Sequence, residues 1–209
     1  MKKVLFFLFI GLNLLACKTN AQDDGWVSIF NGTMENWKVG KNATSFSIED
    51  GAIKVNGPVA HLYYDGPVSK RIFKNFEFKA KVKTLPGANS GIYFHTSYQE
   101  GGWPERGYEV QVNNSHTDWR RTGSLYNISD VRETWAKDNE WYTEYIKVEG
   151  RRVIIKINDN VVVDYTEPCD VKREGNPLRV ISGGTFALQA HDPKSVVYYK
   201  DIMVKILPD

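Results

Sequence analysis

The sequence predicts an all-β fold, an antiparallel sandwich of two sheets. Apolar and polar residues alternate with a period of two in many segments, turn signals rich in Gly, Asn and Asp separate those segments, and the helical period of 3.6 is nearly absent. The 209 residues are enough for one domain with a sizeable core. We therefore expect one β-sandwich domain over residues 25–209.

The clearest strand covers residues 76–83, where Phe76, Phe78, Ala80 and Val82 are expected in the core and the Glu and Lys residues between them in water. A hairpin follows further on, because the turn Asn158-Asp159-Asn160 between two apolar runs tolerates positive φ angles. The other expected strands cover residues 26–30, 46–55 around a turn at 49–51, 61–64, 92–95, 107–113, 142–148, 188–191 and 196–206. Core positions are expected at Phe76, Phe78, Val110, Val112, Ile154, Leu188 and Ile202.

The N-terminal segment is typical of export rather than of the fold. A basic start, Met-Lys-Lys, precedes an apolar run over residues 4–15, as in a signal peptide. Residues 14–17, Leu-Leu-Ala-Cys, resemble the bacterial lipobox, in which Cys17 becomes the lipidated first residue of the mature protein. The alternative is cleavage after Ala21, which would release a soluble protein.

These signals divide the chain into a signal peptide over 1–17, a polar tether over 18–24 and the domain. We expect an exported protein anchored by its lipid to a bacterial membrane and facing the periplasm or the cell surface. No second apolar stretch approaches the ~18 residues that span a membrane. If Cys17 is lipidated or lost, Cys169 has no partner, so neither an intramolecular disulfide nor a cysteine metal site is expected.

The charge balance argues against nucleic acid as a partner. The net charge of +2 comes from 27 basic and 25 acidic residues, without the basic excess that binds phosphate backbones. Six Trp, 11 Tyr and 10 Phe supply either a β-sheet core or platforms for sugar rings. Loops over residues 99–107, 115–121 and 128–139 carry Trp103, Trp119 and Trp135, and such loops often border a binding site.

The segment 107–113 carries the strongest functional signal. Strand alternation places Tyr108, Val110 and Val112 on one face and a row of Glu109, Gln111 and Asn113 on the other. A solvent-facing strand usually carries long charged residues, whereas one carboxylate between two amides suits a sugar-like ligand. The alternative is a solvated face without function.

Two further segments carry similar chemistry. Tyr93 and His95 lie opposite apolar neighbours in 92–95, as do Gln189 and His191 in 188–191. A single histidine is more often structural than catalytic. With Glu109, however, these residues are expected to line one polar cleft covered by a loop tryptophan, for which we select Trp103.

A set of motifs in this order resembles the 3-keto-disaccharide hydrolase family, which is common in exported bacterial proteins. The matching segments are Trp26-Val27-Ser28-Ile29-Phe30-Asn31-Gly32 with Trp37, Glu49-Asp50-Gly51, Pro86-Gly87-Ala88-Asn89-Ser90-Gly91-Ile92, Gly107-Tyr108-Glu109-Val110-Gln111, Thr122-Gly123-Ser124-Leu125-Tyr126, Trp141 and Leu188-Gln189-Ala190-His191. The resemblance runs from about Gly25 to Ile206.

The resemblance implies a concanavalin A-like jelly roll, as in glucanases, that binds sugar on its concave sheet and cleaves glycosides whose glucose unit carries a ketone at C3. Many members continue the last motif as Gln-x-His-Gly, whereas Asp192 follows His191 here. This aspartate either changes a loop or adds a carboxylate to the site.

A C3 ketone acidifies the hydrogen on C2, so the glycosidic oxygen can leave by elimination and water can add later. His191 or Glu109 is the expected base, and Gln111, His95 or Arg121 the expected donor to the enolate oxygen. Contacts to the sugar are expected from Tyr93, Gln111, Asn113, Gln189, Arg121, Trp103 and Asp192. A divalent metal ion held by Glu109 and either His95 or His191 is a further option.

Two other functions stay open. A non-catalytic carbohydrate-binding module needs aromatic platforms but no tuned acid or base. A conventional glycoside hydrolase needs two carboxylates roughly 5 to 9.5 Å apart. Segment 107–113 supplies only Glu109 and lacks the Glu-x-Asp-x-x-Glu signature of laminarinase-like glucanases, so Asp192 or Glu105 would have to supply the second carboxylate.

Overall fold

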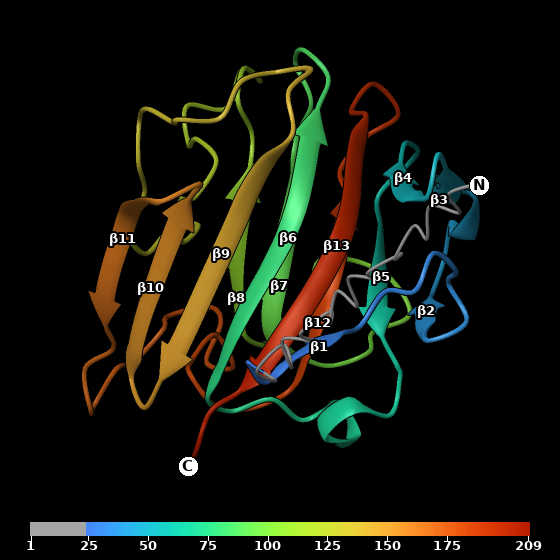
Figure 1. Cartoon of the computed structure of the whole chain (residues 1–209). Helices are drawn as coiled ribbons and strands as arrows, with labels where there is room; N and C mark the ends of the chain where they lie inside the picture. Colours follow the sequence, from blue (N-terminus) through green and yellow to red (C-terminus); the bar gives the residue numbers. More distant parts are fainter. Residues whose placement is uncertain (1–23) are drawn as a thin grey trace, which may run out of the picture.

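Two antiparallel sheets pack face to face in the computed structural model, which describes residues 24–209 (Figure 1). The expected signal peptide, the lipidation site at Cys17 and the tether up to residue 23 lie outside the described residues. Within them, the secondary structure is almost entirely strand, with two short 3-10 turns at Ala43–Ser45 and Val68–Arg71. The expected two-sheet antiparallel sandwich is therefore confirmed.

The larger sheet has the strand order β11-β10-β9-β6-β13-β4-β3, with β1 paired to β13. Its strands are β1 (Trp26–Ser28), β3 (Phe46–Glu49), β4 (Ala52–Val55), β6 (Phe76–Thr84), β9 (Tyr142–Glu149), β10 (Arg152–Ile157), β11 (Asn160–Thr166) and β13 (Val197–Ile206). The smaller sheet has the order β2-β5-β12-β7-β8. Its strands are β2 (Trp37–Val39), β5 (Ala60–Tyr64), β7 (Ser90–Thr96), β8 (Tyr108–Val112) and β12 (Thr185–Ala190). The hairpin β10–β11 turns at Asn158, whose φ of 53° is left-handed.

The two sheets differ in how they are buried. The central strands of the larger sheet alternate between buried and partly exposed residues, so one face packs on the core and the other faces solvent. In β5, β7, β8 and β12 every residue is buried. The inner face of these strands packs on the core, and loops cover their outer face. Polar side chains on that outer face are thereby removed from water.

Most of the expected core positions are buried, but Ile154 is not. Phe76, Phe78, Val110, Val112, Leu188 and Ile202 are fully buried. Ile154 is half-buried on the outer face of β10 beside Lys156, while Val153 and Ile155 point inward. Because Val153, Ile154 and Ile155 are all apolar, the sequence did not show which of them face the core. Lys156 has to remain in contact with water, and this places Ile154 on the outer face with it.

A carboxyl group lies in the core between the sheets. Glu144 of β9 is fully buried, and neither of its carboxyl oxygens has a hydrogen-bond partner among the described residues. Burial raises the pKa of Glu144 well above its ordinary 4.5 because the charged form loses its hydration. Burial therefore favours the protonated form of Glu144 in the folded protein.

No helix among the described residues is long and apolar enough to span a membrane.

Replacing Glu144 by methionine should stabilise the protein at neutral pH. The unfolded chain ionises Glu144 above about pH 4.5 whereas burial raises the pKa in the folded chain, so the stability that is present below that pH is lost as pH rises toward the raised pKa. We expect Glu144→Met to raise the free energy of unfolding at pH 7 by about 1 to 3 kcal/mol, with a smaller gain at pH 4. Urea denaturation at both pH values measures this. The exposed Glu149→Met on the same strand should change stability by less than about 0.5 kcal/mol. A destabilised Glu144→Met protein would contradict this account.

Candidate active site

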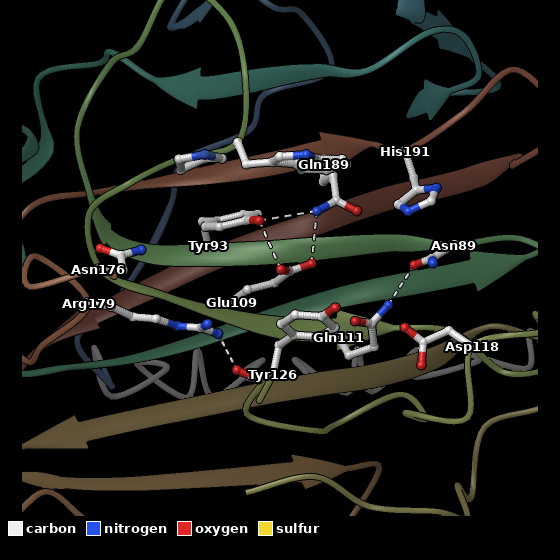
Figure 2. Close-up of a pocket in the computed structure, with 13 residues that line it drawn as sticks. Asn89, Tyr93, Glu109, Gln111, Asp118, Tyr126, Asn176, Arg179, Gln189 and His191 are labelled. Atoms are coloured by element: carbon white, nitrogen blue, oxygen red, sulfur yellow. Dashed lines mark hydrogen bonds between the residues drawn. The ribbon is translucent and has the colours of Figure 1, made fainter. Parts of the chain in front are cut away.

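A cavity of ≈ 270 Å³ opens on the outer face of the smaller sheet (Figure 2). Strand residues form its floor and loop residues its walls. The lining residues are Asn89, Tyr93, Trp103, Pro104, Gly107, Glu109, Gln111, Asp118, Tyr126, Asn176, Arg179, Gln189 and His191. The lining is mostly polar, with one carboxylate on the edge strand β8, a second on a loop, several amides, one guanidinium and one imidazole.

Glu109 lies at the floor of the cavity and is held by two donors. The Tyr93 hydroxyl donates to Oε2 at 2.8 Å, and the Gln189 amide donates to Oε1 at 2.8 Å. Tyr93 is the cross-strand partner of Glu109 in the β7–β8 register, and β12 follows on the other side of β7. The three side chains therefore meet because the strands are adjacent, and the carboxylate cannot rotate without breaking both hydrogen bonds.

The carboxylate reaches this position because Gly91 has no side chain. A Cβ atom at Gly91 would stand 2.3 Å from Glu109 Oε1 and 2.8 Å from its Cγ, closer than real contacts allow. Gly91 is paired with Gln111 on β8, two pairs away from the Tyr93–Glu109 pair. The glycine thus leaves the space in which the Glu109 side chain lies across β7.

Burial raises the pKa of Glu109 to about 7. The hydrogen bonds from Tyr93 and Gln189 act in the opposite direction, as do the charges of Arg179 and His191, because all of them favour the ionised form. The result is a carboxyl group that is half ionised near neutral pH, which is the range where a general base or acid is most effective.

His191 follows the end of β12 and is oriented by the next residue. Its Nδ1 lies 2.8 Å from Asp192 Oδ2. Asp192 also accepts hydrogen bonds from the Ser195 hydroxyl and from the backbone N–H groups of Lys194 and Ser195. Partial burial raises the pKa of Asp192, but these hydrogen bonds prevail and lower it to about 2. Asp192 is therefore an ionised partner of His191 and does not itself line the cavity.

Trp103 and the amides complete the walls. The Trp103 ring lies 5.6 Å from the His191 ring and 5.7 Å from the His61 ring, and the side chain is 48% exposed. The Gln111 amide donates to Asn89 Oδ1 at 2.6 Å. Gln189 Oε1 is buried and has no partner among the described residues, so it remains an acceptor for a ligand. Trp119 and Trp135 do not line this cavity.

His95 does not join the cavity, contrary to the expectation of one shared cleft. Its φ of 55° is left-handed, which breaks the alternation of β7. The ring packs against Phe76 and Phe94 in the core; Nε2 lies 2.9 Å from the Lys74 carbonyl oxygen, and Nδ1 accepts the Ser182 N–H at 3.2 Å. Both ring nitrogens are thus used within the protein, and burial lowers the pKa of His95 to about 4.

Asn113 and Arg121 also lie outside the cavity and organise a loop. The Asn113 amide donates to the carbonyl oxygens of Asp118 and Arg120, and Arg121 donates to those of His116 and Asp118. β8 ends at Val112, so Asn113 no longer follows its alternation. The effect of both residues is to fix the loop that brings Asp118 to the cavity wall.

Sequence reasoning missed several lining residues. Arg179 lies in an irregular segment without a period; it donates to the Tyr126 carbonyl oxygen, and its guanidinium lies 5.7 Å from the Tyr126 ring centroid. Asn89 and Tyr126 belong to segments that carry the family resemblance, which could have identified them. Asp118 lines the cavity, whereas Glu105 does not, so the second carboxylate is not the one expected. Asp118 accepts hydrogen bonds from Arg120.

The sequence left open a divalent metal ion held by Glu109 and either His95 or His191, and the described residues supply no complete set of ligands for it. Glu109 and His191 both line the cavity, whereas His95 points into the core. Among residues 24–209, no group of three or more His, Cys, Asp or Glu side chains could hold a metal ion.

Comparisons with known proteins place this site in context. A model of the family described as the 3-keto-alpha-glucoside-1,2-lyase-like domain matches residues 25–205. A search of curated proteins found no match.

Solved structures share the fold. A candidate glycosyl hydrolase from Parabacteroides distasonis ATCC 8503 has a TM-score of 0.74 at 24% identity, over 88% of this chain and 94% of that chain. The carbohydrate-binding module CBM66 from Bacillus subtilis has a TM-score of 0.52 at 14% identity, over 87% and 95%. The Ca2+/Man-bound exoplasmic/lumenal domain of VIP36 has a TM-score of 0.57 at 11% identity, over 89% of each chain. At these identities the similarity shows the fold alone.

Removing the Tyr93 hydroxyl should raise the pKa of Glu109 further. Burial raises the pKa of Glu109, and the hydrogen bond from Tyr93 lowers it by stabilising the carboxylate. Tyr93→Phe removes that hydrogen bond, so the effect of burial on the pKa is less well offset. Titration of the Glu109 carboxyl carbon by 13C NMR should give a pKa of about 7 in the unmodified protein and a higher value in the variant. Tyr198→Phe, which removes a hydroxyl bonded to Glu49 on the larger sheet, should leave the pKa of Glu109 unchanged. An unchanged or lower pKa in Tyr93→Phe would contradict the assigned role of the hydroxyl.

Proposed function

Because the chain belongs to the family of 3-keto-alpha-glucoside-1,2-lyase-like domains, we propose that it cleaves the C1 glycosidic bond of 3-keto-glucosides such as 3-keto-disaccharides. The observation that carries the proposal is Glu109, a buried carboxyl group with a pKa of about 7 at the floor of a cavity lined by amides, an imidazole and an indole. Amides and aromatic rings are suited to a sugar, and such a carboxyl group is suited to proton transfer at neutral pH.

The proposed reaction is an elimination followed by hydration. The ketone at C3 acidifies the hydrogen on C2, and a base removes that proton. The electron pair forms the C1–C2 double bond through an enolate, and the bond from C1 to the glycosidic oxygen breaks. The departing oxygen takes a proton. Addition of water across C1 and C2 then gives 3-keto-glucose, so the overall change is hydrolysis.

We assign Glu109 as the base and His191 as the proton donor. The ionised carboxylate of Glu109 is fixed by Tyr93 and Gln189, so little reorganisation is needed before it accepts the C2 proton. Asp192 Oδ2 lies 2.8 Å from Nδ1 of His191 and orients the imidazole ring that we assign to protonate the leaving oxygen. Asp192 positions His191 without itself lining the cavity.

Other lining residues supply the remaining interactions. Arg179 carries a positive charge close enough to lower the pKa of Glu109, and its guanidinium can donate to the enolate oxygen that develops at C3. The unpartnered Gln189 Oε1 can accept a hydrogen bond from a sugar hydroxyl. Trp103 covers the cavity and offers an aromatic face to the sugar ring.

The function is tested by comparing oxidised and unoxidised substrates. Purified protein should release 3-keto-glucose from 3-keto-disaccharides and leave the parent disaccharides intact. Glu109→Gln and His191→Ala should each lower turnover by about 10²-fold or more if they carry the proton transfers. Glu49→Gln, an exposed carboxylate on the larger sheet, is the matched control and should keep full activity.

Other outcomes would redirect the assignment. Cleavage of unoxidised disaccharides would favour a conventional hydrolase that uses Asp118, the second carboxylate at the cavity. Tight sugar binding without turnover of any keto-sugar would favour a carbohydrate-binding module. Full activity of both variants would remove the proposed mechanism.

The proton abstraction has its own signatures. A substrate deuterated at C2 should react more slowly when that step limits the rate. The value of kcat/KM should fall as pH drops below about 7, because protonated Glu109 cannot accept the C2 proton. A rate that is insensitive to pH between 5 and 8, or unaffected by deuterium when chemistry limits turnover, would argue against Glu109 as the base.

We also propose that the protein is exported and anchored through a lipid on Cys17, as the N-terminal sequence indicates. Cys17→Ser should then release the protein from the membrane fraction, as measured by immunoblotting of fractionated cells. If the unmodified protein is already soluble after export, cleavage after Ala21 replaces this proposal.

A further inference from the structure

A second and larger cavity, of ≈ 650 Å³, lies on the same outer face of the smaller sheet. Tyr63 of β5, Thr96 of β7 and Thr185 of β12 contribute from the sheet, and its walls come from residues 70–72, 97–98 and 182–184. None of these residues lines the first cavity. The loop between β7 and β8 serves both, since its Tyr98 borders the second cavity and its Trp103 borders the first.

The strand register connects the two cavities through one row of residues. Lys38 of β2 pairs with Tyr63, Tyr63 with Ala187 of β12, and Ala187 with Tyr93 of β7, which pairs with Glu109. Tyr63, Ala187 and Tyr93 form one apolar cluster in the middle of this row. Four steps at the strand spacing of about 4.8 Å place Lys38 roughly 19 Å from Glu109.

The second cavity is strongly cationic. Lys38, Lys70, Arg71 and Arg106 line it, against the single carboxylate of Asp65. Asp65 is already engaged by Arg71. Among the described residues, Lys38, Lys70 and Arg106 make no salt bridge. Three positive charges around one hollow therefore lack a counter-charge from the protein and favour an anionic ligand.

Two of these cations are positioned by neighbouring groups. Lys38 Nζ lies 3.8 Å from the centroid of the Tyr98 ring, which limits its motion. Arg106 Nη2 donates to the Ser182 hydroxyl at 3.2 Å and to the Gly183 carbonyl oxygen at 3.4 Å. One end of this guanidinium is thereby fixed, while its other N–H groups remain for a ligand.

Aromatic and hydroxyl groups lie beside the charges. The Tyr98 ring is 39% exposed and stands edge-on to the Tyr63 ring at 5.5 Å. Thr96 Oγ1 is buried at the base of the cavity without a hydrogen-bond partner among the described residues. A partly exposed tyrosine ring and a free hydroxyl group fit the ring and hydroxyls of a sugar, and they are not needed to bind a simple ion.

We propose that this cavity is a second sugar-binding site that takes a pyranose carrying an anionic group, a carboxylate or a sulfate. Lys38 and Arg106 contact the anion, and Tyr98 packs against the sugar ring. This site is distinct from the cavity around Glu109, and its ligand does not have to be oxidised at C3.

The test is calorimetric titration of the full chain with four unoxidised probes: methyl glucuronide, glucose 6-sulfate, methyl glucoside and sodium sulfate. Because none carries a C3 ketone, the result does not depend on the proposed reaction. We expect at least one acidic sugar to bind tenfold or more tightly than methyl glucoside, and its affinity to fall as NaCl screens the cations. The acidic sugar that binds more tightly, methyl glucuronide or glucose 6-sulfate, shows whether the site prefers a carboxylate or a sulfate.

Variants locate the binding. Lys38→Met should weaken binding of the acidic sugar tenfold or more, and this exposed position should tolerate the change without loss of thermal stability. The matched control is Lys156→Met, which removes a lysine that lies 5.1 Å from the Tyr145 ring on the larger sheet and should leave affinity unchanged. Equal binding of acidic and neutral sugars, or undiminished binding by Lys38→Met, would overturn the proposal. Inorganic sulfate that binds as tightly as the acidic sugars would overturn it as well.

Discussion

The site depends on the cost of removing the Glu109 carboxylate from water. That cost arises because loops cover the outer face of the smaller sheet, so β7, β12 and the edge strand β8 are buried on both faces. Two hydrogen-bond donors from adjacent strands offset part of the cost, and the remainder keeps the pKa of the group near neutrality. The same burial that defines the fold of this sheet therefore sets the chemistry at its surface.

Glu144 provides a comparison within the same molecule. Both glutamates are buried on strands. Glu144 has no donor within hydrogen-bond distance among residues 24–209 and its pKa is raised well above 4.5, whereas Glu109 has two donors and a pKa of about 7. Burial alone thus produces an inert acid in the core. Burial together with oriented donors produces a group that can exchange a proton near pH 7.

Period-two patterns predicted most strands, the two-sheet sandwich and the row from Glu109 to Gln111, because alternation follows directly from strand geometry. They failed where the backbone leaves that geometry. His95 adopts a left-handed φ at the end of its strand and turns into the core. Arg179 comes from an irregular segment, so no period could bring it to the cavity. The Asp192 partner of His191 depends on the turn over residues 192–195, which only the structure reveals.

His191 and Asp192 are consecutive residues, which has a consequence for how the site tolerates motion. In a pair assembled from separate segments, any shift of one segment changes the separation of the two groups. Here one short turn carries both, and Ser195 and Lys194 fix the carboxylate from within that same turn. A displacement of this turn would carry the imidazole and the carboxylate together. The 2.8 Å contact between His191 Nδ1 and Asp192 Oδ2 therefore does not depend on how distant segments of the chain pack.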